Sequence, residues 1–456
     1  MSLTTKLLLP RMSKDRIDAQ RAILDKMESM LPTCMAPSYE RWVHFQDAYK
    51  TSVQRWYPYR EGYSTELVTS FIEQFNITGA VLDPFSGSGT TLLAARQAGL
   101  DSVGIEVNPI SVLVSESENE VYFQEDITDL TGFIITLKGL KREKDLLTST
   151  YPLAEKMFNE EILSALLQIH SVIDSTPNDK IKRLGLISWL STIDEVSDVK
   201  KEGNGLKYRY RKRTKNGYID IPKVQWENEH FPGDRFLLVV NKITDKLERA
   251  LDDICYAYGR VDKKPIIING DCLKLGELTD KKFQLTFFSP PYCNCFDYFE
   301  IHKVELWLGG FVSSQRDIKT LRETGFRSNI NALDKKAITY KNDDLECLIS
   351  LFESPRLWSQ KIPNVVRGYF DDTHTLLKAL YDQTVPGGYV GIVIGNSAYS
   401  GVIVPSDLLT AKIGQEVGFE VENIFIARHL TTSSQQKEEL EPLKEYLRES
   451  IVLLKK

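Results

Sequence analysis

The pentapeptide FSPPY at residues 288–292 begins at the last residue of the mostly apolar run FQLTFF at 283–288. Two prolines end the strand expected there, because proline has no backbone N–H to donate and its ring fixes φ. The loop then presents the hydroxyl of Ser289, the carbonyls of Pro290 and Pro291 and the ring of Tyr292. Because the prolines hold the carbonyls stiffly, this loop can accept hydrogen bonds and offer a ring for stacking without reorganising.

The stretch DPFSGSGTT at residues 83–91 has the composition of a ligand-binding turn. The chain leaves an apolar strand expected at 80–83, turns through Gly87 and Gly89, and enters a helix expected at 90–98. Glycine permits close approach of a ligand, and the free amides of a helix N-terminus attract acceptor groups. The turn lacks the lysine of an ATPase P-loop, so we expect a ligand with a carboxylate or other acceptors rather than a phosphate chain.

Two further strands end in carboxylates. The strand expected at 102–106 ends in Glu106, where doubly wound nucleotide folds place the carboxylate that accepts from both ribose hydroxyls. The strand expected at 265–271 ends in Asp271, followed by Cys272, and a carboxylate there could accept from an adenine amine. These strand ends predict one cleft for a ligand with an adenosine part and an amino-acid-like part.

The elements that must position these groups indicate an α/β fold. Apolar strands around a helix are typical of a parallel βαβ unit, since both faces of such a sheet are buried. With further strands at 283–288, 386–396, 419–428 and the C-terminal ESIVLLKK, we expect a seven-stranded, mostly parallel, Rossmann-like sheet whose last pair is antiparallel. Two insertions interrupt it, and the first is mainly helical by its apolar spacing. The expected organisation is an N-terminal helical segment at 1–54, a catalytic core at 55–110, 264–308 and 363–456, an inserted domain at 111–263 and a second insertion at 309–362.

The amino-acid composition excludes several classes of protein. The chain has 456 residues, of which 42% are hydrophobic and 26% charged, as in ordinary globular proteins. A net charge of -6 argues against a surface that is basic throughout, but it allows a local basic patch. The six cysteines are scattered, and CNC at 293–295 is too short a pattern for a metal site, so no metal is expected. No apolar run is long enough for a membrane span, and we expect a cytoplasmic protein without a membrane partner.

The motifs LDPFSGSGTTLLAA, GIEVNP, GDCLKL and SPPY together resemble the amino-group DNA methyltransferases. The spelling SPPY most resembles the N4-cytosine branch, and the resemblance covers about 55–110, 264–308 and 385–456. It implies S-adenosyl-L-methionine as cofactor, S-adenosyl-L-homocysteine as product and double-stranded DNA as substrate. It also implies a modification enzyme of a restriction-modification system, with a cognate restriction endonuclease as a possible partner.

The resemblance implies roles for individual residues. The glycine turn would surround the methionine part of the cofactor, Glu106 would hold the ribose, Asp271 and Cys272 would flank the adenine, and the aromatic loop before the turn would close the pocket. The implied cofactor-binding residues are Tyr57, Pro58, Asp83, Pro84, Phe85, Ser86, Gly87, Gly89, Thr90, Thr91, Glu106, Asn108, Asp271 and Cys272.

In this setting the FSPPY loop acts on an exocyclic amine. The amine of cytosine is a poor nucleophile because its lone pair is delocalised into the ring. If Ser289 Oγ and the Pro290 carbonyl accept from the amine, its lone pair is directed at the methyl sulfonium, while Tyr292 stacks on the flipped base. Carbon-5 methylation, which needs a cysteine after the proline, is excluded because Tyr292 follows Pro291.

A basic run at 200–215 is the expected DNA contact, with tyrosines alternating between its cations. A solvated hairpin face is the alternative. The second insertion, which carries Arg316, Arg322 and Arg327, is a rival for the recognition role. The expected DNA-binding residues are Lys207, Arg209, Arg211, Lys212 and Arg213, with Phe296 and Tyr298 as walls of the base pocket or as ordinary core.

Three alternatives stay open. An adenine-N6 DNA methyltransferase is the nearest, because its usual spelling differs from this one by an aspartate in place of Ser289. A tRNA guanine-N2 methyltransferase shares the glycine turn but continues its loop as PPYG, where Cys293 stands here. A catalytically silent subunit that binds cofactor and DNA is the third, and the intact SPPY loop argues against it.

Overall fold

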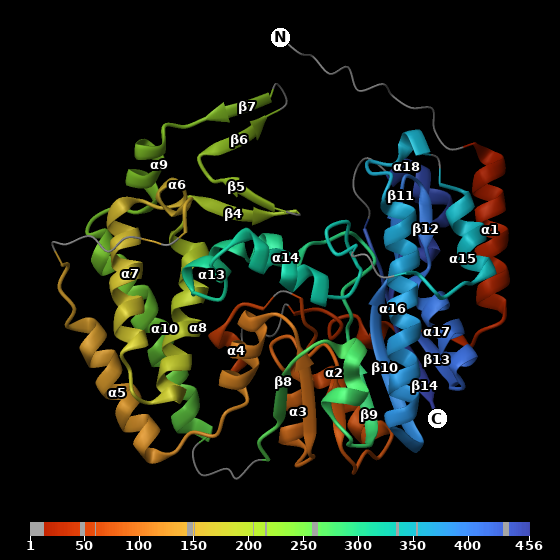
Figure 1. The fold of residues 1–456 in the computed structure, drawn as a ribbon, viewed down its shortest axis with the longest axis horizontal. Helices are drawn as coiled ribbons and strands as arrows, with labels where there is room; N and C mark the ends of the chain where they lie inside the picture. The colour runs from red at the N-terminus through yellow and green to blue at the C-terminus, as the bar shows by residue number, and fades with distance from the viewer. Residues whose placement is uncertain are drawn as a thin grey trace.

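A mixed sheet of eight strands forms the centre of the computed structural model (Figure 1). The structure describes residues 13–45, 51–59, 61–143, 149, 151–203, 205–214, 217–257, 263–333, 337–352, 354–431 and 437–456. The strands in sheet order are β1 (Thr33–Met35), β13 (Glu420–His429), β14 (Arg448–Lys455), β10 (Thr384–Gly395), β9 (Phe283–Phe288), β2 (Val81–Asp83), β3 (Ser102–Glu106) and β8 (Ile266–Asn269).

Strand direction follows the prediction. All neighbouring strands are parallel except β14, which is antiparallel to both β10 and β13. The expected mostly parallel α/β sheet is therefore confirmed, with one strand more than the seven expected. The additional strand, β1, pairs with β13 at the edge of the sheet. It lies in the N-terminal segment, where the structure has one long helix followed by this strand.

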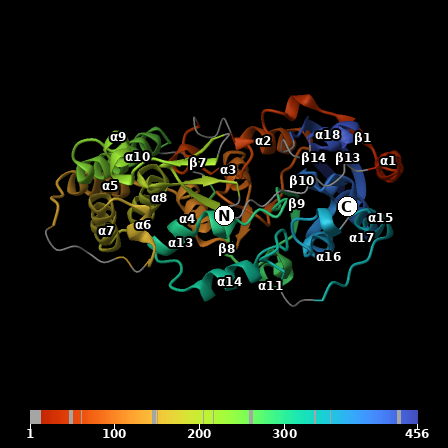
Figure 2. The same cartoon turned by 90° about the horizontal axis from the view of Figure 1, so that it is seen from above.

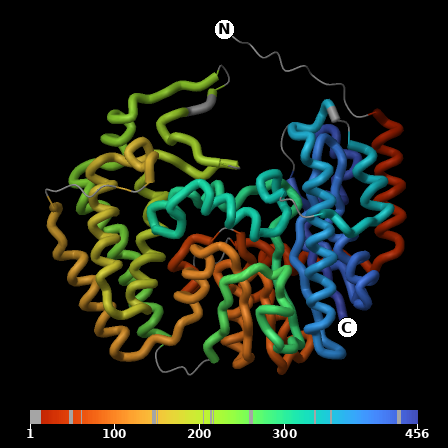
Figure 3. The backbone as a smooth tube through the Cα atoms, in the orientation of Figure 1, coloured from red at the N-terminus to blue at the C-terminus, as the bar shows by residue number. Residues whose placement is uncertain are grey.

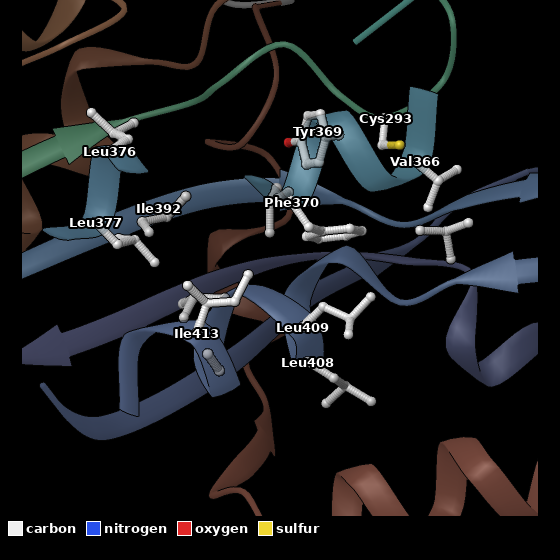
Figure 4. Packing of buried hydrophobic residues seen from close by; sticks show 14 of the residues in the cluster. Cys293, Val366, Tyr369, Phe370, Leu376, Leu377, Ile392, Leu408, Leu409 and Ile413 are labelled. Atoms are coloured by element: carbon white, nitrogen blue, oxygen red, sulfur yellow. The ribbon is translucent and has the colours of Figure 1, made fainter. Parts of the chain in front are cut away.

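Helices cover both faces of the sheet because alternate strand residues point to opposite sides. Val81, Phe287 and Ile451 pack against α2 (Thr65–Gln74) and α3 (Thr90–Gln97) on one face. Leu82, Phe288 and Val452 face the other side. That side is covered by α16 (Ile362–Gln383) and α17 (Ser406–Val417), whose apolar side chains interdigitate in Figure 4.

The N-terminal helix packs against the C-terminal half of the chain. Gln20 of α1 (Lys14–Ser29) donates to the carbonyl of Gly401 at 3.1 Å and accepts from the nitrogen of Ile403 at 2.6 Å. Its amide is fully buried, so both bonds are shielded from water. The remaining elements of this half are α11 (Leu275–Leu278), α15 (Asp343–Ser350), β11 (Ser397–Tyr399), β12 (Val402–Val404) and α18 (Lys437–Leu440).

The first insertion leaves the sheet after β3 and returns at β8, as the backbone trace shows (Figure 3). Its helices form a second hydrophobic core around the fully buried Trp189, to which Trp56 and Trp307 also belong. The helices are α4 (Pro109–Glu118), α5 (Gln124–Lys138), α6 (Ala154–Met157), α7 (Glu160–Asp174), α8 (Asp179–Val196), α9 (Lys223–His230) and α10 (Arg235–Ala257). Two hairpins project beside them, β4 (Val199–Glu202) with β5 (Gly205–Tyr208), and β6 (Arg211–Thr214) with β7 (Gly217–Asp220).

The segment after β9 crosses above the central strands, between the two halves of the molecule (Figures 1 and 2). It contains α12 (Tyr298–Ile301), α13 (Lys303–Leu308) and α14 (Gln315–Thr324). Among the helices that the structure describes, none combines the length and the apolar character that a membrane crossing requires. Short 3₁₀ helices lie at Pro37–Tyr39, Gln54–Trp56, Cys272–Lys274, Ser354–Arg356 and Glu441–Tyr446.

Candidate functional site

A cavity of about 420 Å³ lies at the carboxyl ends of β2, β3 and β9. The chain order of the strands reverses between β2 and β9, and in open α/β sheets ligands bind outside such a reversal. The cavity brings together residues of the glycine turn and of the FSPPY loop. Predicted residues that line it are Asp83, Phe85, Ser86, Gly87, Thr90, Glu106, Asn108, Ser289, Pro290, Pro291, Tyr292, Phe296 and Tyr298.

The glycine turn forms one wall. Gly87 and Gly89 have φ of 50° and 88°, a backbone conformation that side chains with a Cβ rarely adopt. A Cβ on Gly87 would lie 2.9 Å from the Tyr59 hydroxyl, and one on Gly89 would lie 2.5 Å from Ser115 Oγ. Helix α3 begins at the next residue, so its free amides stand at the cavity. Of the predicted turn residues, Pro84, Gly89 and Thr91 do not line the cavity, and Thr91 is fully buried.

Asp83 ends β2 as a buried carboxyl. Its Oδ1 accepts from the Phe85 nitrogen at 3.0 Å, and its Oδ2 lies 3.3 Å from the Tyr63 hydroxyl. Burial raises the pKa of Asp83 to about 7, although hydrogen bonds from Phe85, Thr91 and Tyr63 work in the other direction. A nearby positive charge would ionise this carboxyl, which makes it responsive to a cationic ligand. Sequence reasoning missed Tyr63, which also lines the cavity.

Glu106 ends β3 and faces the same cavity. Its Oε2 accepts from the Gly87 nitrogen at 2.9 Å, and its Oε1 accepts from the nitrogens of Val107 at 2.9 Å and Asn108 at 2.8 Å. Burial raises the pKa of Glu106, and these three N–H groups oppose that shift. Asn108 also caps α4 by accepting from the Ile110 nitrogen at 3.1 Å. A carboxylate with about four acceptor sites retains capacity for a ligand hydroxyl.

Asp271 and Cys272 lie apart from the cavity. Asp271 Oδ1 accepts from the Leu273 nitrogen at 3.0 Å and so caps the short turn after β8. Cys272 is buried in the core, and burial raises the pKa of its thiol well above its usual value. Strand β8 forms one edge of the sheet, beyond β3.

The aromatic loop contributes residues other than those expected. Tyr57 and Pro58 line a second cavity of about 290 Å³, between this loop and the insertion. Tyr59, Glu61 and Tyr63 line the main cavity instead. The sequence WYPYREGY contains the alternation that could have pointed to the later tyrosines.

The FSPPY loop places Ser289 half-buried at the cavity and packs the Tyr292 ring against Gly395 of β10, where a Cβ would come within 2.6 Å of the ring. The Tyr292 hydroxyl donates to Glu449 Oε1 at 2.6 Å. Glu449 Oε2 in turn lies 2.5 Å from Arg428 Nε. Glu449 and Arg428 both line the cavity, and sequence reasoning missed them.

Two aromatic rings extend the cavity wall beyond this loop. Phe296 and Tyr298 lie 4.8 Å apart, edge to face at 72°, and both are half-buried. Cys293 and Cys295 are buried, and the Tyr399 hydroxyl donates to the Cys293 carbonyl at 2.8 Å.

The second insertion supplies a further wall through Phe326, Ser328 and Asn329. Arg327 between them is buried and pairs with Asp372, its Nε lying 3.0 Å from Oδ1. Arg322 pairs with Asp297 at 2.9 Å and with Glu300 at 2.9 Å. These two arginines therefore hold the insertion in place, whereas Arg316 is exposed.

Ion pairs also occupy much of the basic run. Lys207 pairs with Glu202 at 2.5 Å on an exposed hairpin face. Arg209 donates to the carbonyls of Val199 and Asp194, which fastens the hairpin to α8. Arg211 lies 3.2 Å from Asp220 and 4.7 Å from the centre of the Tyr218 ring. The side chains of Lys212 and Arg213 lie outside the described residues. Tyr208 and Tyr210 stack on each other at 5.0 Å.

The hydrogen-bonding groups that line the main cavity fit a nucleoside linked to an amino acid. Glu106 offers a carboxylate acceptor, α3 begins at Thr90 beside the cavity, and buried Ser86 Oγ has no hydrogen-bond partner among the described residues. In the part of the chain that the structure describes, we find no group of three or more His, Cys, Asp or Glu side chains suited to a metal ion.

Comparisons with known proteins relate the chain to methyltransferases. Residues 37–116 match a family, N6_N4_Mtase, described as DNA methylase. The type II methyltransferase M.BsoBI of Geobacillus stearothermophilus is 27% identical over 87% of this chain and 84% of its own length. M.AvaI of Nostoc is 25% identical over 91% and 85%, and M.MvaI of Kocuria varians is 25% identical over 73% of each chain. The chain is thus a distant homologue of type II methyltransferases.

Proposed function

We propose that this protein is a DNA methyltransferase of type II that methylates the exocyclic N4 of a flipped-out cytosine, as the modification enzyme of a restriction-modification system. The observation that carries the proposal is the meeting of the FSPPY loop and the glycine turn at one cavity. The similarity to type II methyltransferases over most of the chain supports the DNA substrate. A cognate restriction endonuclease is the proposed partner.

The proposed cofactor is S-adenosyl-L-methionine, which supplies a methyl group on a sulfonium and leaves as S-adenosyl-L-homocysteine. Glu106 would accept from the ribose hydroxyls, and the turn through Gly87 would surround the methionine part. Asp83, with a pKa of about 7, would ionise beside the positive charge of this ligand. Tyr59 and Tyr63, which line the cavity, take the role of closing the pocket that the resemblance implied for Tyr57 and Pro58. An adenine role for Asp271 has no contact with the cavity to support it.

The chemistry of the loop is alignment rather than covalent catalysis. Ser289 Oγ and the Pro290 carbonyl accept from the target amine, which withdraws the nitrogen lone pair from the ring and directs it at the methyl group. Tyr292, already fixed against Gly395, offers its ring to the flipped base. Phe296 and Tyr298 enclose the base from the other side. The excess proton of the methylated amine leaves to solvent or to a neighbouring acceptor.

The hairpins of the insertion are the proposed DNA contact. Lys207, Arg211, Lys212 and Arg213 would face phosphates, while Arg209 is committed to holding the hairpin. The ion pairs of Lys207 and Arg211 are exposed. Because an exposed ion pair contributes little free energy, these cations can leave their carboxylates for phosphates at little cost.

The choice of cytosine rests on Ser289. A neutral hydroxyl is a weaker acceptor than the aspartate usual at this position in adenine-N6 enzymes. Adenine-N6 methylation is the second candidate, because the matched family includes both N6 and N4 enzymes by its name.

Mass spectrometry of nucleosides tests the base. DNA incubated with the protein and labelled cofactor should yield N4-methylcytosine, and a Ser289→Ala protein serves as the blank. N6-methyladenine as the sole product would reject the cytosine assignment but keep DNA methylation. Methylation of RNA and not of duplex DNA would reject the DNA assignment.

A further inference from the structure

Several hydrogen bonds converge on Asp253, a residue of α10 in the first insertion. Its Oδ2 accepts from the Val53 nitrogen at 3.1 Å, from Arg55 Nε at 3.0 Å and from Trp56 Nε1 at 2.9 Å. Its Oδ1 accepts from Arg55 Nη2 at 2.8 Å. Asp253 is 5% exposed, so these bonds are largely shielded from water. A carboxylate of the insertion thus fastens the 51–59 segment, which leads into the aromatic loop.

The backbone of the 51–59 segment needs such an anchor at Val53. Val53 has φ of 73° and ψ of -57°, and the Gln54 nitrogen donates to the Ser52 carbonyl at 3.0 Å. These features define a γ-turn with positive φ, which is the rarer and strained form of this turn. Positive φ is especially unfavourable for a β-branched residue, and it persists only where the surrounding structure holds it. The bond from the Val53 nitrogen to Asp253 is one contact that does so.

On its other side, the 51–59 segment contacts the wall of the main cavity. Gln54 is buried, and its Nε2 donates to Thr90 Oγ1 at 3.2 Å. Thr90 is the first residue of α3 and lines the cavity. The Tyr59 hydroxyl lies so close to Gly87 that a Cβ on this glycine would be 2.9 Å from it. The segment therefore lies between the insertion and the glycine turn and contacts both.

The path from Asp253 to the cavity is short and well packed. Trp56 and Tyr57 are buried in the second hydrophobic core. The Tyr59 nitrogen donates to the Tyr57 carbonyl at 2.8 Å, which folds the chain at Pro58 into a tight turn. Only two residues separate Trp56, which Asp253 holds, from Tyr59, which lines the cavity. A displacement of the chain at Asp253 would therefore move the Tyr59 ring.

The anchor acts as a charged group. Burial raises the pKa of Asp253, but hydrogen bonds from Arg55, Val53 and Trp56 outweigh burial and hold that pKa below its ordinary value. Asp253 is therefore a carboxylate at neutral pH, and its hydrogen bonds are of the stronger, charge-assisted kind. An amide in its place would have a single acceptor oxygen and would turn N–H groups toward the donors of the segment.

We propose that Asp253 is a positioning residue for cofactor binding, because it holds the 51–59 segment in the conformation in which Tyr59 closes over the glycine turn. The proposal rests on the proposed function, since it takes S-adenosyl-L-methionine as the ligand of the main cavity. It makes the insertion, whose hairpins are the proposed DNA contact, a part of the cofactor site as well.

The substitution Asp253→Asn tests the proposal while keeping the size of the side chain. If the segment then holds Tyr59 in place for a tenth of the time, the apparent Kd rises about tenfold. We expect the Kd for S-adenosyl-L-homocysteine, measured by calorimetry, to rise by about this factor or more. KM for the cofactor should rise in parallel. The kcat at saturating cofactor and KM for DNA should stay within about twofold of wild type, because only cofactor binding is impaired.

Asp252→Asn is the matched control, since Asp252 precedes Asp253 on α10 and is exposed. Its Kd should equal that of wild type. A folded Asp253→Asn protein with a wild-type Kd would overturn the proposal. If Asp253→Asn does not fold, Arg55→Met replaces it, because the Arg55 side chain is 34% exposed and its loss removes the ion pair alone. Arg55→Met should raise the Kd about threefold or more, and a wild-type Kd in this protein would overturn the proposal equally.

Val53→Gly separates a role through the segment from a general effect on stability. Glycine adopts positive φ readily, so the γ-turn no longer depends on its anchor. In the Asp253→Asn background, Val53→Gly should return the Kd to within about threefold of wild type. No recovery would mean that Asp253 acts on the stability of the insertion and not through the 51–59 segment, which would also overturn the proposal.

The positioning role and the proposed function fail in different ways. If wild type binds no S-adenosyl-L-homocysteine, the cofactor assignment fails, and the positioning role fails with it. If wild type binds this ligand and the Asp253→Asn protein binds it equally well, the positioning role fails and the proposed function stands. Trypsin cleavage after Arg55, located by mass spectrometry, reports on the segment without any ligand. It should be faster in Asp253→Asn than in Asp252→Asn, and equal rates would show that Asp253 does not hold the segment.

Discussion

Glu106 accepts a hydrogen bond of 2.9 Å from the backbone nitrogen of Gly87, and this bond ties the end of β3 to the turn that follows β2. The turn needs positive φ at Gly87, a conformation that glycine adopts readily and residues with a Cβ adopt rarely. One carboxylate thus shapes the turn and presents its remaining acceptors to the cavity.

Glu106→Gln should weaken cofactor binding. The amide loses the negative charge that strengthens each hydrogen bond, and charged bonds contribute about 1.5–3 kcal/mol. We expect the Kd for S-adenosyl-L-homocysteine to rise about tenfold to a hundredfold, which calorimetry measures. Glu420→Gln, on an exposed position of β13, is the control. An unchanged Kd would show that Glu106 does not bind the cofactor.

Ser289→Ala should stop methyl transfer without loss of cofactor. Removing one preorganised hydrogen-bonding group from a reacting centre lowers kcat about 100-fold or more. Transfer of labelled methyl groups to DNA gives the rate, and calorimetry with S-adenosyl-L-homocysteine gives the Kd. Ser175→Ala, at the end of α7, is the control. Wild-type kcat in the Ser289→Ala protein would contradict the mechanism.

Asp83 should make stability depend on pH. Its pKa is about 7 in the folded protein against 3.8 as the ordinary value, so the folded state holds a proton that the unfolded chain releases. The stabilisation is complete below about pH 4 and is lost as the pH rises through about 7. The free energy of unfolding of wild type, minus that of Asp83→Asn, should therefore fall between pH 4 and pH 7. Urea unfolding at several pH values measures this difference in free energy. A difference that does not change with pH would show that the pKa of Asp83 is not raised in the folded protein.

Arg327 should be necessary for stability. Its side chain is 6% exposed and pairs with Asp372, which is 3% exposed. Arg327→Met leaves buried carboxylates unpaired, which costs about 3–5 kcal/mol in the free energy of unfolding. Arg367→Met breaks the surface pair with Glu346 and should cost about 1 kcal/mol or less. Equal losses in the free energy of unfolding would show that the buried pair stabilises the protein no more than the surface pair does.

The hairpin cations should set the salt dependence of DNA binding. Each lost phosphate contact lowers the slope of log K against log salt by about 0.9. Replacing Lys207, Lys212 and Arg213 by alanine should flatten the slope by about that amount for every contact made, as fluorescence anisotropy measures. Lys14→Ala with Lys26→Ala on α1, across the molecule in Figure 1, should leave it unchanged. An unchanged slope in the triple variant would show that the basic run is a solvated hairpin face that does not contact phosphates.

Much of the sheet and of the glycine turn could be predicted because their signals are local. The strand before Asp83 and the strand before Glu106 are apolar runs with polar ends, and buried parallel strands have that pattern. The strand β1 escaped notice because Thr33–Met35 is three residues long and has no alternation to mark it. Its identity as a strand comes from pairing with β13, which is distant in sequence.

Residues around the site that came from distant strands could not be predicted. Glu449 and Arg428 follow no motif, and only the insertion of β14 beside β13 and β10 brings them to Tyr292. The basic run shows the same limit. Arg209 is held by Asp194, a partner that composition does not reveal.

The position of β14 also constrains how the protein is made. This strand is the last of the chain described here, yet it lies inside the sheet, between β10 and β13. During synthesis β10 and β13 therefore have no partner strand between them, and their backbone groups stay exposed, until residue 455 has left the ribosome. Until then Glu449 is also missing from the wall of the cavity. Completion of the sheet and completion of this wall of the cavity are therefore one event in folding.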